Sequence, residues 1–383
     1  MNEPVYLDNA ATTPMDPRVL EAMLPHLGRR GNPSSLHAAG AAAQEAIEEA
    51  RESVANLIHA ETGEIVFTGG GTEADNLAVL GLARASGKRH ALISAVEHAA
   101  VREAVRSLES SGYELETLGV DETGLVNPEE FAAALRPDTA FAAVTWANNE
   151  VGTVQPVKEL AEICVGVGVP FHTDAVQAAG RLPVNVREVA ASTVAISSHK
   201  LYGPQGVGAL YVRGGVRLEP VTFGGGQENG FRSGTENVAG IVGFGAAARL
   251  AEEELEGRGR HEERLREALI SGATAIPGVR LNGHPDRRLP NNVHLGVEGV
   301  EAEGLVLFCD AQGYAIGSGS ACASGGHKAS PVLLAMGQDE REAFSAVRVT
   351  VGKDNTLEEI EGFLQAFCGA VEQLRQLSPL YAG

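Results

Sequence analysis

Short apolar runs alternate with longer amphipathic stretches through the first two thirds of the chain. The runs are rich in β-branched and aromatic residues, as buried strands are, and most of the stretches between them have apolar residues at helical spacing. Alternating strands and helices predict an α/β fold with a mostly parallel sheet. The runs that predict strands are 64–68, 91–94, 141–145, 170–173, 193–196 and 208–212.

The last third has a different pattern and predicts a smaller α+β domain. It has a helical stretch at 261–273, strands at 292–297 and around residue 348, and a closing helix at 356–377. We place a large domain at residues 16–255 and the small domain at 1–15 and 256–383, joined through the charged, helix-prone segment 252–260. Near the start, Ser34 or Ser35 is the expected N-cap of a helix that ends near Ile58.

Composition narrows the classes of partner. The chain has 383 residues, 44% of them hydrophobic, which is enough for a large core. With 30 basic and 50 acidic residues its formal charge is −20, which disfavours nucleic acid and anionic membranes as partners. The four cysteines form no CxxC pattern, so neither a metal site nor a disulfide framework is predicted. There is no signal peptide or long apolar segment, and we expect a cytoplasmic protein.

One lysine lies directly after a predicted strand, in a turn rich in glycine and proline. Lys200 follows the run 193–196 and precedes Gly203 and Pro204. Burial of an ammonium group is costly and lowers its pKa from about 10.4, which is what an imine-forming lysine needs. A solvent-exposed lysine in an ordinary turn would give the same local pattern, so this stretch alone leaves both interpretations open.

Residues 69–72, Gly-Gly-Gly-Thr, follow another predicted strand and open a helix. Free backbone N–H groups at the helix start, together with the Thr72 hydroxyl, would bind a phosphate. The turn is neither a P-loop nor the GxGxxG pattern of dinucleotide-binding proteins. Asp174 ends a third predicted strand, and the polar cluster 146–153 follows a fourth. His98 lies at the start of a helix, where it could stack on a flat ring, transfer a proton or make an ordinary hydrogen bond.

Pyridoxal 5′-phosphate requires a phosphate site, a lysine and a carboxylate close together, and these groups supply all three. The carboxyl ends of parallel strands meet at one sheet edge, so residues 69–72, Asp174 and Lys200 are expected together. The phosphate would anchor the cofactor, Lys200 would hold its aldehyde as an imine, and Asp174 would keep the pyridine nitrogen protonated. Two unit charges about 4 Å apart contribute roughly 4 kcal/mol at an effective dielectric constant near 20, or about three pK units.

The sequence resembles the cysteine desulfurases of the NifS/IscS type, which are fold-type I pyridoxal-phosphate enzymes. The resemblance covers nearly the whole chain, and the order and spacing of its motifs are more specific than any motif alone. The matching segments are 6–14, 31–37, 69–76, 148–156, 172–177, 198–204, 232–237 and 317–324.

The resemblance implies a role for individual residues. Lys200 would form the imine and remove the substrate's Cα proton, and His98 would stack on the ring and donate a proton. Asp174 would pair with the pyridine nitrogen and Gln177 with the ring hydroxyl. The substrate carboxylate would bind Asn149 and Arg348, although an arginine in an alternating strand could also face solvent. The phosphate would bind Gly71, Thr72, Ser197 and His199, and also Thr235 of a second subunit in a homodimer.

Cys322 is the residue that the resemblance makes specific to a desulfurase. It lies in a stretch of small residues that predicts an accessible loop, whereas Cys164, Cys309 and Cys368 lie in apolar helical settings. By the resemblance, a Cys322 thiolate takes sulfur from L-cysteine as a persulfide, leaves L-alanine, and passes the sulfur to an acceptor protein for iron–sulfur cluster assembly or another sulfur pathway.

The sequence departs from the family pattern in places. Gly326–Ser330 reads Gly-His-Lys-Ala-Ser where Ser-Leu-Glu-Pro-Ser is expected, and Asn229 replaces a usual arginine near the subunit interface. No extended scaffold-docking tail follows Pro379. Acceptor choice is therefore open.

Other functions stay open on the sequence. A selenocysteine lyase or a pyridoxal-phosphate aminotransferase would use the same cofactor site. A non-catalytic scaffold of this fold is disfavoured by the joint presence of Lys200, Asp174 and Cys322. A nicotinamide-dependent oxidoreductase would rest on the glycine-rich turn alone.

Overall fold

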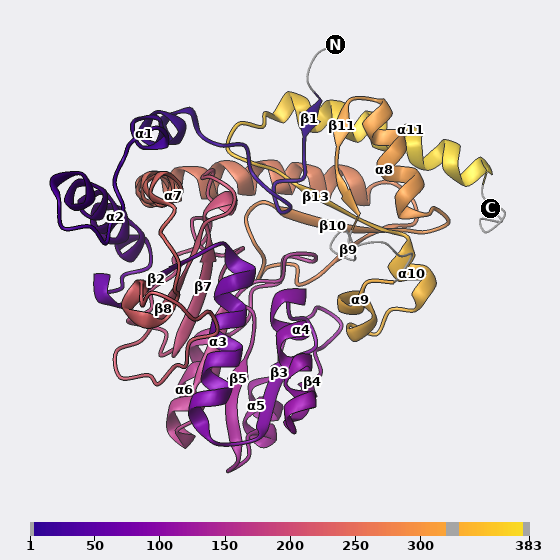
Figure 1. The fold of residues 1–383 in the computed structure, drawn as a ribbon. Helices are drawn as coiled ribbons and strands as arrows, with labels where there is room; N and C mark the ends of the chain where they lie inside the picture. The colour runs from indigo at the N-terminus through magenta and orange to yellow at the C-terminus, as the bar shows by residue number, and fades with distance from the viewer. Residues whose placement is uncertain (1–3, 319–328, 378–383) are drawn as a thin grey trace.

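The apolar runs of the first two thirds of the chain form one seven-stranded sheet (Figure 1). The structure is a computed structural model that describes residues 4–318 and 329–377. In spatial order the strands are β2 (Ile65–Thr68), β8 (Gly208–Val212), β7 (Thr193–Ser197), β6 (Phe171–Asp174), β5 (Thr139–Ala143), β3 (His90–Ser94) and β4 (Glu114–Leu118). Strands β4, β3, β5, β6 and β7 are parallel, and β8 is antiparallel to both of its neighbours. The predicted mostly parallel α/β sheet is confirmed.

Helices cover both faces of this sheet, because successive strand residues point to opposite sides. The helices are α1 (Pro17–Leu27), α2 (Ala38–Leu57), α3 (Gly71–Ser86), α4 (Ala99–Ser107), α5 (Pro128–Ala134), α6 (Val157–Val167) and α7 (Val238–Thr274). In β2, Ile65 and Phe67 pack with α2 and α7 on one face, while Val66 packs with α3 on the other. Coverage of both faces explains why the strands are continuous apolar runs.

The last third of the chain forms a second, antiparallel sheet together with the N-terminal segment. Its order is β12 (Gly317–Ser318), β13 (Ala346–Thr350), β10 (Asn292–Val297) and β9 (Val279–Asn282). Strand β1 (Val5–Tyr6) pairs in parallel with β11 (Tyr314–Ala315). The remaining helices are α8 (Ala302–Ala311), α9 (Pro331–Ala335), α10 (Glu340–Phe344) and α11 (Leu357–Leu377), and the short 3₁₀ helices are η1 (Thr62–Glu64), η2 (Glu109–Ser111), η3 (Ser198–Lys200) and η4 (Glu228–Gly230).

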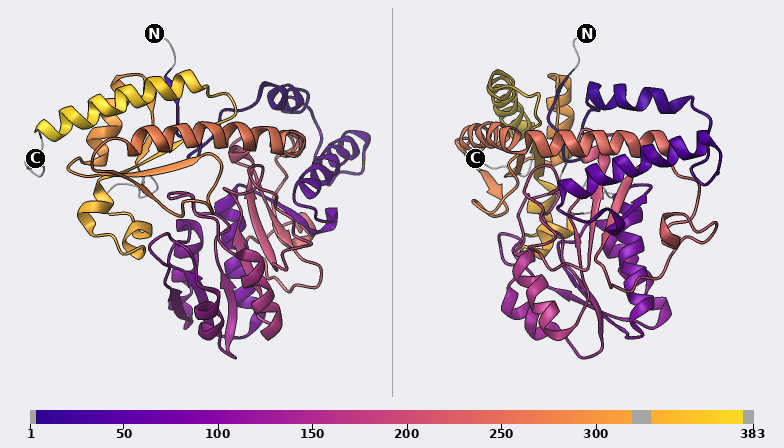
Figure 2. Two further views of the ribbon diagram at one scale, coloured as in Figure 1. Left: turned by 180° about the vertical axis from the view of Figure 1, so that it is seen from behind. Right: turned by 90° about the vertical axis from the view of Figure 1, so that its left-hand side faces the viewer.

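Helix α7 runs along both sheets and belongs to both cores (Figure 2). Phe244 and Leu250 pack in the core of the large sheet, whereas Leu265 and Leu269 pack in the core of the second sheet. The prediction of a separate helix at 261–273 is therefore wrong, since that stretch continues one 37-residue helix. The predicted domain boundary at residue 255 falls inside α7, and the division into two domains stays a prediction.

The N-terminal end of α2 also differs from the prediction. Its cap is His37, whose Nδ1 accepts a hydrogen bond from the backbone N–H of Gly40 at 3.2 Å. The backbone carbonyl of Ser35 lies so close to Gly40 that a Cβ at residue 40 would be 2.2 Å from its oxygen. The expected cap at Ser34 or Ser35 is wrong, because the loop folds back over Gly40 and leaves the capping position to the imidazole. Among the described residues, no helix combines the length and apolarity needed to cross a bilayer.

Candidate active site

The carboxyl ends of the parallel strands bring the predicted site residues to one edge of the large sheet. Asp174 ends β6, and Lys200 ends the 3₁₀ turn η3 that follows β7. Because β6 and β7 are adjacent and Asp174 pairs with Ala195, the two side chains leave the sheet from neighbouring positions. His98 leaves the same edge after β3 as the N-cap of α4. The structure thus places Asp174 and Lys200 at one sheet edge, as the sequence pattern predicts, and it places His98 at the same edge.

The start of α3 forms the part of the site suited to a phosphate. Gly70 has φ = 144° and precedes Gly71, the first residue of the 16-residue helix. A Cβ at Gly71 would lie 2.8 Å from Val176 Cγ2 and 3.5 Å from Ser197 Cβ, so a side chain would close the space in front of the helix. Ser197 Oγ is buried and has no hydrogen-bond partner among the described residues. Free helix N–H groups and an unpaired hydroxyl fit a bound phosphate.

His199 and Thr72 flank this region. His199 Nδ1 lies 3.0 Å from Thr12 Oγ1. Burial, reinforced by the charges of Lys200 and Arg181, lowers the pKa of His199 to about 4, so its ring is neutral and one of its nitrogens can donate to an anion. Thr72 is exposed at the helix start.

Lys200 is held by the N-terminal segment. Its Nζ donates to the backbone carbonyl oxygens of Ala10 and Ala11, each at 2.6 Å. The Gln177 Nε2 group donates to the same Ala10 oxygen at 3.0 Å, while its Oε1 is buried without a partner among the described residues. That oxygen fits the expected partner role toward a ring hydroxyl.

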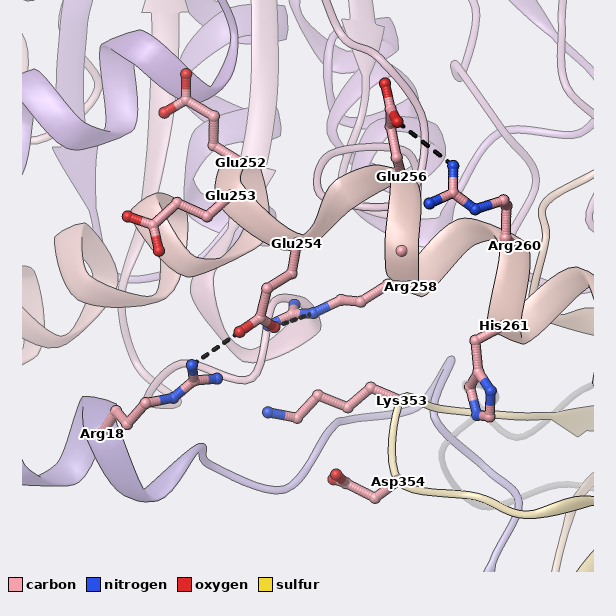
Figure 3. Close-up of a pocket in the computed structure, with 11 residues that line it drawn as sticks. Arg18, Glu252, Glu253, Glu254, Glu256, Arg258, Arg260, His261, Lys353 and Asp354 are labelled. Carbon is pink, nitrogen blue, oxygen red and sulfur yellow. Dashed lines mark hydrogen bonds and ion pairs between the residues drawn. The ribbon is translucent and has the colours of Figure 1, made fainter.

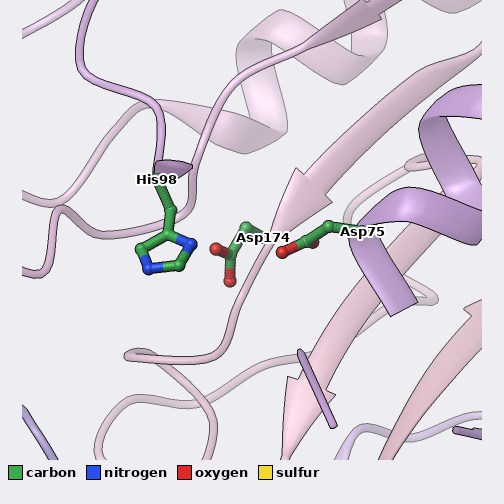
Figure 4. A group of neighbouring side chains, drawn as sticks. All are labelled: Asp75, His98 and Asp174. Atoms are coloured by element: carbon green, nitrogen blue, oxygen red, sulfur yellow. The ribbon is translucent and has the colours of Figure 1, made fainter. Parts of the chain in front are cut away.

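Three titratable groups lie together where β6 ends (Figure 4). A carboxylate oxygen of Asp75, a carboxylate oxygen of Asp174 and a ring nitrogen of His98 all lie within 4.8 Å of one another. Burial raises the pKa of Asp174, opposed by His98, by a hydrogen bond from the Val176 N–H and by Lys200. Burial raises the pKa of Asp75 well above its usual range, with further contributions from Asp174 and then Glu97. A carboxylate at the position of Asp174 fits a protonated pyridine nitrogen.

Two further buried groups support this cluster, and sequence reasoning did not single them out. Burial is the main reason that the pKa of Glu97 is raised to about 8, although its Oε1 accepts from Ser94 Oγ and from the Thr145 N–H. His172 lies 3.2 Å from Asp75 through Nε2, and burial lowers its pKa to about 3. In the sequence, the one feature that pointed to Glu97 was its position next to His98. For Asp75, the neighbour of His172, it was a position within the motif at 69–76.

The expected substrate-carboxylate residues meet on the other side of the site. Arg348 Nη1 donates to the backbone carbonyl of Asn149 at 3.0 Å, and its Nη2 donates to Asp8 Oδ1 at 2.7 Å. Arg348 is only 2% exposed, so the alternative in which it faces solvent is wrong. Asp8 was absent from the predicted site because 340 residues separate it from Arg348.

Two predicted residues lie outside this group. Thr235 is exposed in the segment that leads into α7. Cys322 falls at 319–328, outside the described residues. The other cysteines carry free thiols, and burial raises the pKa values of Cys164 and Cys309 to about 12.

A separate groove of about 810 Å³ lies where α1 and α7 meet the segment after β13 (Figure 3). Glu254 bonds both Arg18, at 2.8 Å, and Arg258, and Glu256 bonds Arg260 at 3.4 Å. Because these charges are paired with one another and Lys200 is not part of the lining, the groove is not the candidate active site.

Comparison with known proteins agrees with this geometry. The model of the "Aminotransferase class-V" family matches residues 5–363. The chain belongs to the class-V aminotransferase family. Members of this family depend on pyridoxal phosphate, and the predicted fold-type I architecture and cofactor are thereby confirmed.

Within this family the relatives are cysteine desulfurases. The chain is 44% identical to cysteine desulfurase IscS 1 of Archaeoglobus fulgidus, over 98% of this chain and 99% of that protein. It is 46% identical to cysteine desulfurase IscS of Neisseria meningitidis, over 99% of this chain and 95% of the relative. A solved NifS-like protein is 36% identical with a TM-score of 0.91, covering 97% of this chain and all of the other. The structure of SspA in complex with cysteine is 33% identical with a TM-score of 0.81, covering 92% of this chain and all of that one. The resemblance to NifS/IscS-type desulfurases is confirmed.

Proposed function

We propose that the protein is a cysteine desulfurase that converts L-cysteine to L-alanine with pyridoxal 5′-phosphate and transfers the sulfur to Cys322. The observation that carries the proposal is the placement of Asp174 at the end of β6 and of Lys200 just after the adjacent strand β7, with the glycine-rich start of α3 at the same sheet edge. This arrangement meets the needs of the cofactor. Two relatives, at 44% and 46% identity, are named cysteine desulfurases, and a similar solved structure holds cysteine. Both findings support L-cysteine as the substrate.

Different residues of the site bind the cofactor, bind the substrate and transfer protons. When bound, pyridoxal phosphate supplies an electron sink for the substrate's Cα. Asp174 holds the proton of the pyridine nitrogen, and Lys200 removes the Cα proton. Arg348 and Asn149 hold the substrate carboxylate. The residues that would hold the cofactor phosphate are Gly71, Thr72, Ser197 and His199, together with Thr235 of a second subunit.

The sulfur-transfer step uses the thiolate of Cys322. Cys322 Sγ attacks the substrate sulfur, and an S–S bond forms as the substrate's C–S bond breaks. The electron pair of that bond goes to Cβ, which takes a proton from His98, and Lys200 returns the proton to Cα. Cys322 is thereby oxidised to a persulfide, and the carbon skeleton leaves as L-alanine. An acceptor protein then receives the sulfur for iron–sulfur cluster assembly or another sulfur pathway. The cytoplasm, where thiols stay reduced, suits this chemistry.

The test is product analysis with the purified holoenzyme and a thiol reductant. We expect equal amounts of alanine and sulfide from L-cysteine. L-Selenocysteine and pairs of an amino acid with a keto acid serve as comparison substrates. If only selenocysteine is consumed, the protein is a selenocysteine lyase, and if only amino-group transfer is seen, it is an aminotransferase. A protein that shows no visible absorption band of bound cofactor would be a scaffold of this fold.

We also propose that the protein is a homodimer, which the exposed apolar residues of one face support. Leu20, Leu24 and Leu27 of α1 are 46%, 57% and 62% exposed, and Leu36 in the following loop is fully exposed. The three α1 positions recur at helical spacing and form one stripe. Such a stripe is unusual on a monomer and typical of a subunit interface. Thr235 could then reach the phosphate site of the second subunit.

Replacement of Leu24 with glutamate should weaken this dimer, because a charge would be buried at the interface. Sedimentation at several protein concentrations should show the variant dissociating at a concentration at least about tenfold above that of the parent. Val167→Glu is the matched control, since Val167 is 58% exposed on α6, at the other end of the molecule from α1 (Figure 1). A Leu24→Glu variant that sediments as the parent does would exclude this face as the interface.

A further inference from the structure

The guanidinium group of Arg348 is already paired with a carboxylate of the chain. Nη2 donates to Asp8 Oδ1 at 2.7 Å and Nη1 to the Asn149 carbonyl, whereas Nε is buried without a partner among the described residues. The side chain of Arg348 is 3% exposed, and that of Asp8 is 19% exposed. Solvent therefore reaches this ion pair through Asp8 rather than through the arginine.

The fold holds Asp8 in this position by its backbone. Asp8 forms a bridge with Thr350 of β13, and the Tyr6 hydroxyl donates to the Asp8 carbonyl at 3.0 Å. On the opposite side, a Cβ at Gly317 would lie 2.7 Å from Asp8 Oδ1 and 3.2 Å from Arg348 Nη2. Glycine at residue 317 therefore leaves the space that the pair occupies, and a side chain there would push the Asp8 carboxylate aside.

The same segment also holds the cofactor lysine. Ala10 and Ala11 accept hydrogen bonds from Lys200 Nζ two and three residues after Asp8. Residues 8–11 therefore contact both cationic groups that the proposed function assigns to the amino acid substrate.

We propose that Asp8 is a specificity-determining residue, which occupies Arg348 as an internal carboxylate until the carboxylate of the substrate replaces it. The inference rests on the proposed function in one respect, that Arg348 receives the substrate carboxylate. A guanidinium binds a carboxylate best through two parallel N–H bonds, and the unpartnered Nε of Arg348 leaves one such donor for an incoming group. Two carboxylates on one arginine repel each other, so the substrate displaces Asp8. An amine without a carboxylate cannot displace Asp8 from Arg348, so its binding should not depend on Asp8.

Asp8→Asn tests this exchange, because it keeps the shape of the side chain and removes the competing charge. The purified holoenzyme is titrated with L-alanine and with ethylamine, and binding is followed by the visible absorption of the cofactor. We expect the variant to bind L-alanine about tenfold more tightly than the parent and ethylamine with unchanged affinity. Asp138→Asn is the matched control, since Asp138 forms an exposed ion pair with Arg136 at 3.1 Å and lies before β5, at the opposite end of the strand from the site.

The outcomes separate this inference from the proposed function. A parent whose absorption does not respond to L-alanine contradicts the proposed function itself. A parent that responds, with an Asp8→Asn variant that binds L-alanine equally or more weakly, overturns the role of Asp8 alone. If Asp8→Asn does not retain the cofactor, Asp8→Ser replaces it, and the same selective gain for L-alanine is expected.

Discussion

Replacement of Lys200 with alanine should lower the rate of alanine formation from L-cysteine by about four orders of magnitude, the upper range for loss of a general base. The amine is held by the carbonyls of Ala10 and Ala11, and it lies near Asp174, which in turn lies beside His98. The visible absorption band of the lysine-bound cofactor should be lost with it. Added methylamine should restore part of the rate, because a small amine can enter the space that the side chain leaves.

Lys158→Ala is the matched control for this variant, since Lys158 is exposed on α6. It should retain both the rate and the absorption band. A thermal unfolding midpoint for Lys200→Ala near that of the parent would show that the loss is chemical. If Lys200→Ala kept the visible band and turned over L-cysteine at the parental rate, the assignment of Lys200 as the cofactor lysine would be wrong.

The order of the elements and the convergence of Lys200 and Asp174 with residues 69–72 could be predicted because both follow from local pattern. Strands buried on both faces are continuous apolar runs, and polar residues placed after them reach the carboxyl edge of a parallel sheet. These inferences need no knowledge of how distant segments pack. They extend to β10, where the predicted strand 292–297 matches the observed one residue for residue.

The errors arose where tertiary packing overrides local preference. Gly257 and Gly259 lie inside α7, and glycine in a helix interior costs up to about 1 kcal/mol relative to alanine. A break near these residues was therefore a reasonable prediction. The helix continues because Leu250 on one side and Leu265 on the other anchor it in two different cores, so burial at both ends outweighs the local cost.

The unpredicted site residues are those whose role exists only in three dimensions. Asp8 lies in a short N-terminal segment whose partner is 340 residues away, and nothing in its local sequence indicates an ion pair. Asp75 lies in an amphipathic helix, where an acidic residue usually faces water. It is instead 1% exposed, because α3 packs against the sheet at the position where His172 and Asp174 emerge. A buried carboxylate cluster of this kind becomes evident only when the structure shows that residues from three separate elements are neighbours.

Replacement of Cys322 with serine should abolish alanine and sulfide formation from L-cysteine, a loss of at least about a thousandfold, while the visible absorption of the bound cofactor persists. Cys164 and Cys309 are fully buried, and burial raises their pKa values to about 12, so at neutral pH neither supplies a thiolate. Cys368 is half-buried on α11, where its Sγ donates to Glu372 Oε1 at 3.8 Å.

Cys368→Ser is the matched control, because it removes the more accessible of the three other thiols and should leave the rate unchanged. Mass spectrometry after a short exposure to L-cysteine should show one added sulfur atom on the peptide that contains Cys322, and none on the peptide with Cys368. Cys322→Ser should still respond to L-cysteine in its cofactor absorption, since Arg348, Asn149 and Lys200 are unchanged. Sulfide release by Cys322→Ser at the parental rate would show that sulfur leaves the substrate without this thiol. The enzyme would then be a lyase rather than a sulfur carrier.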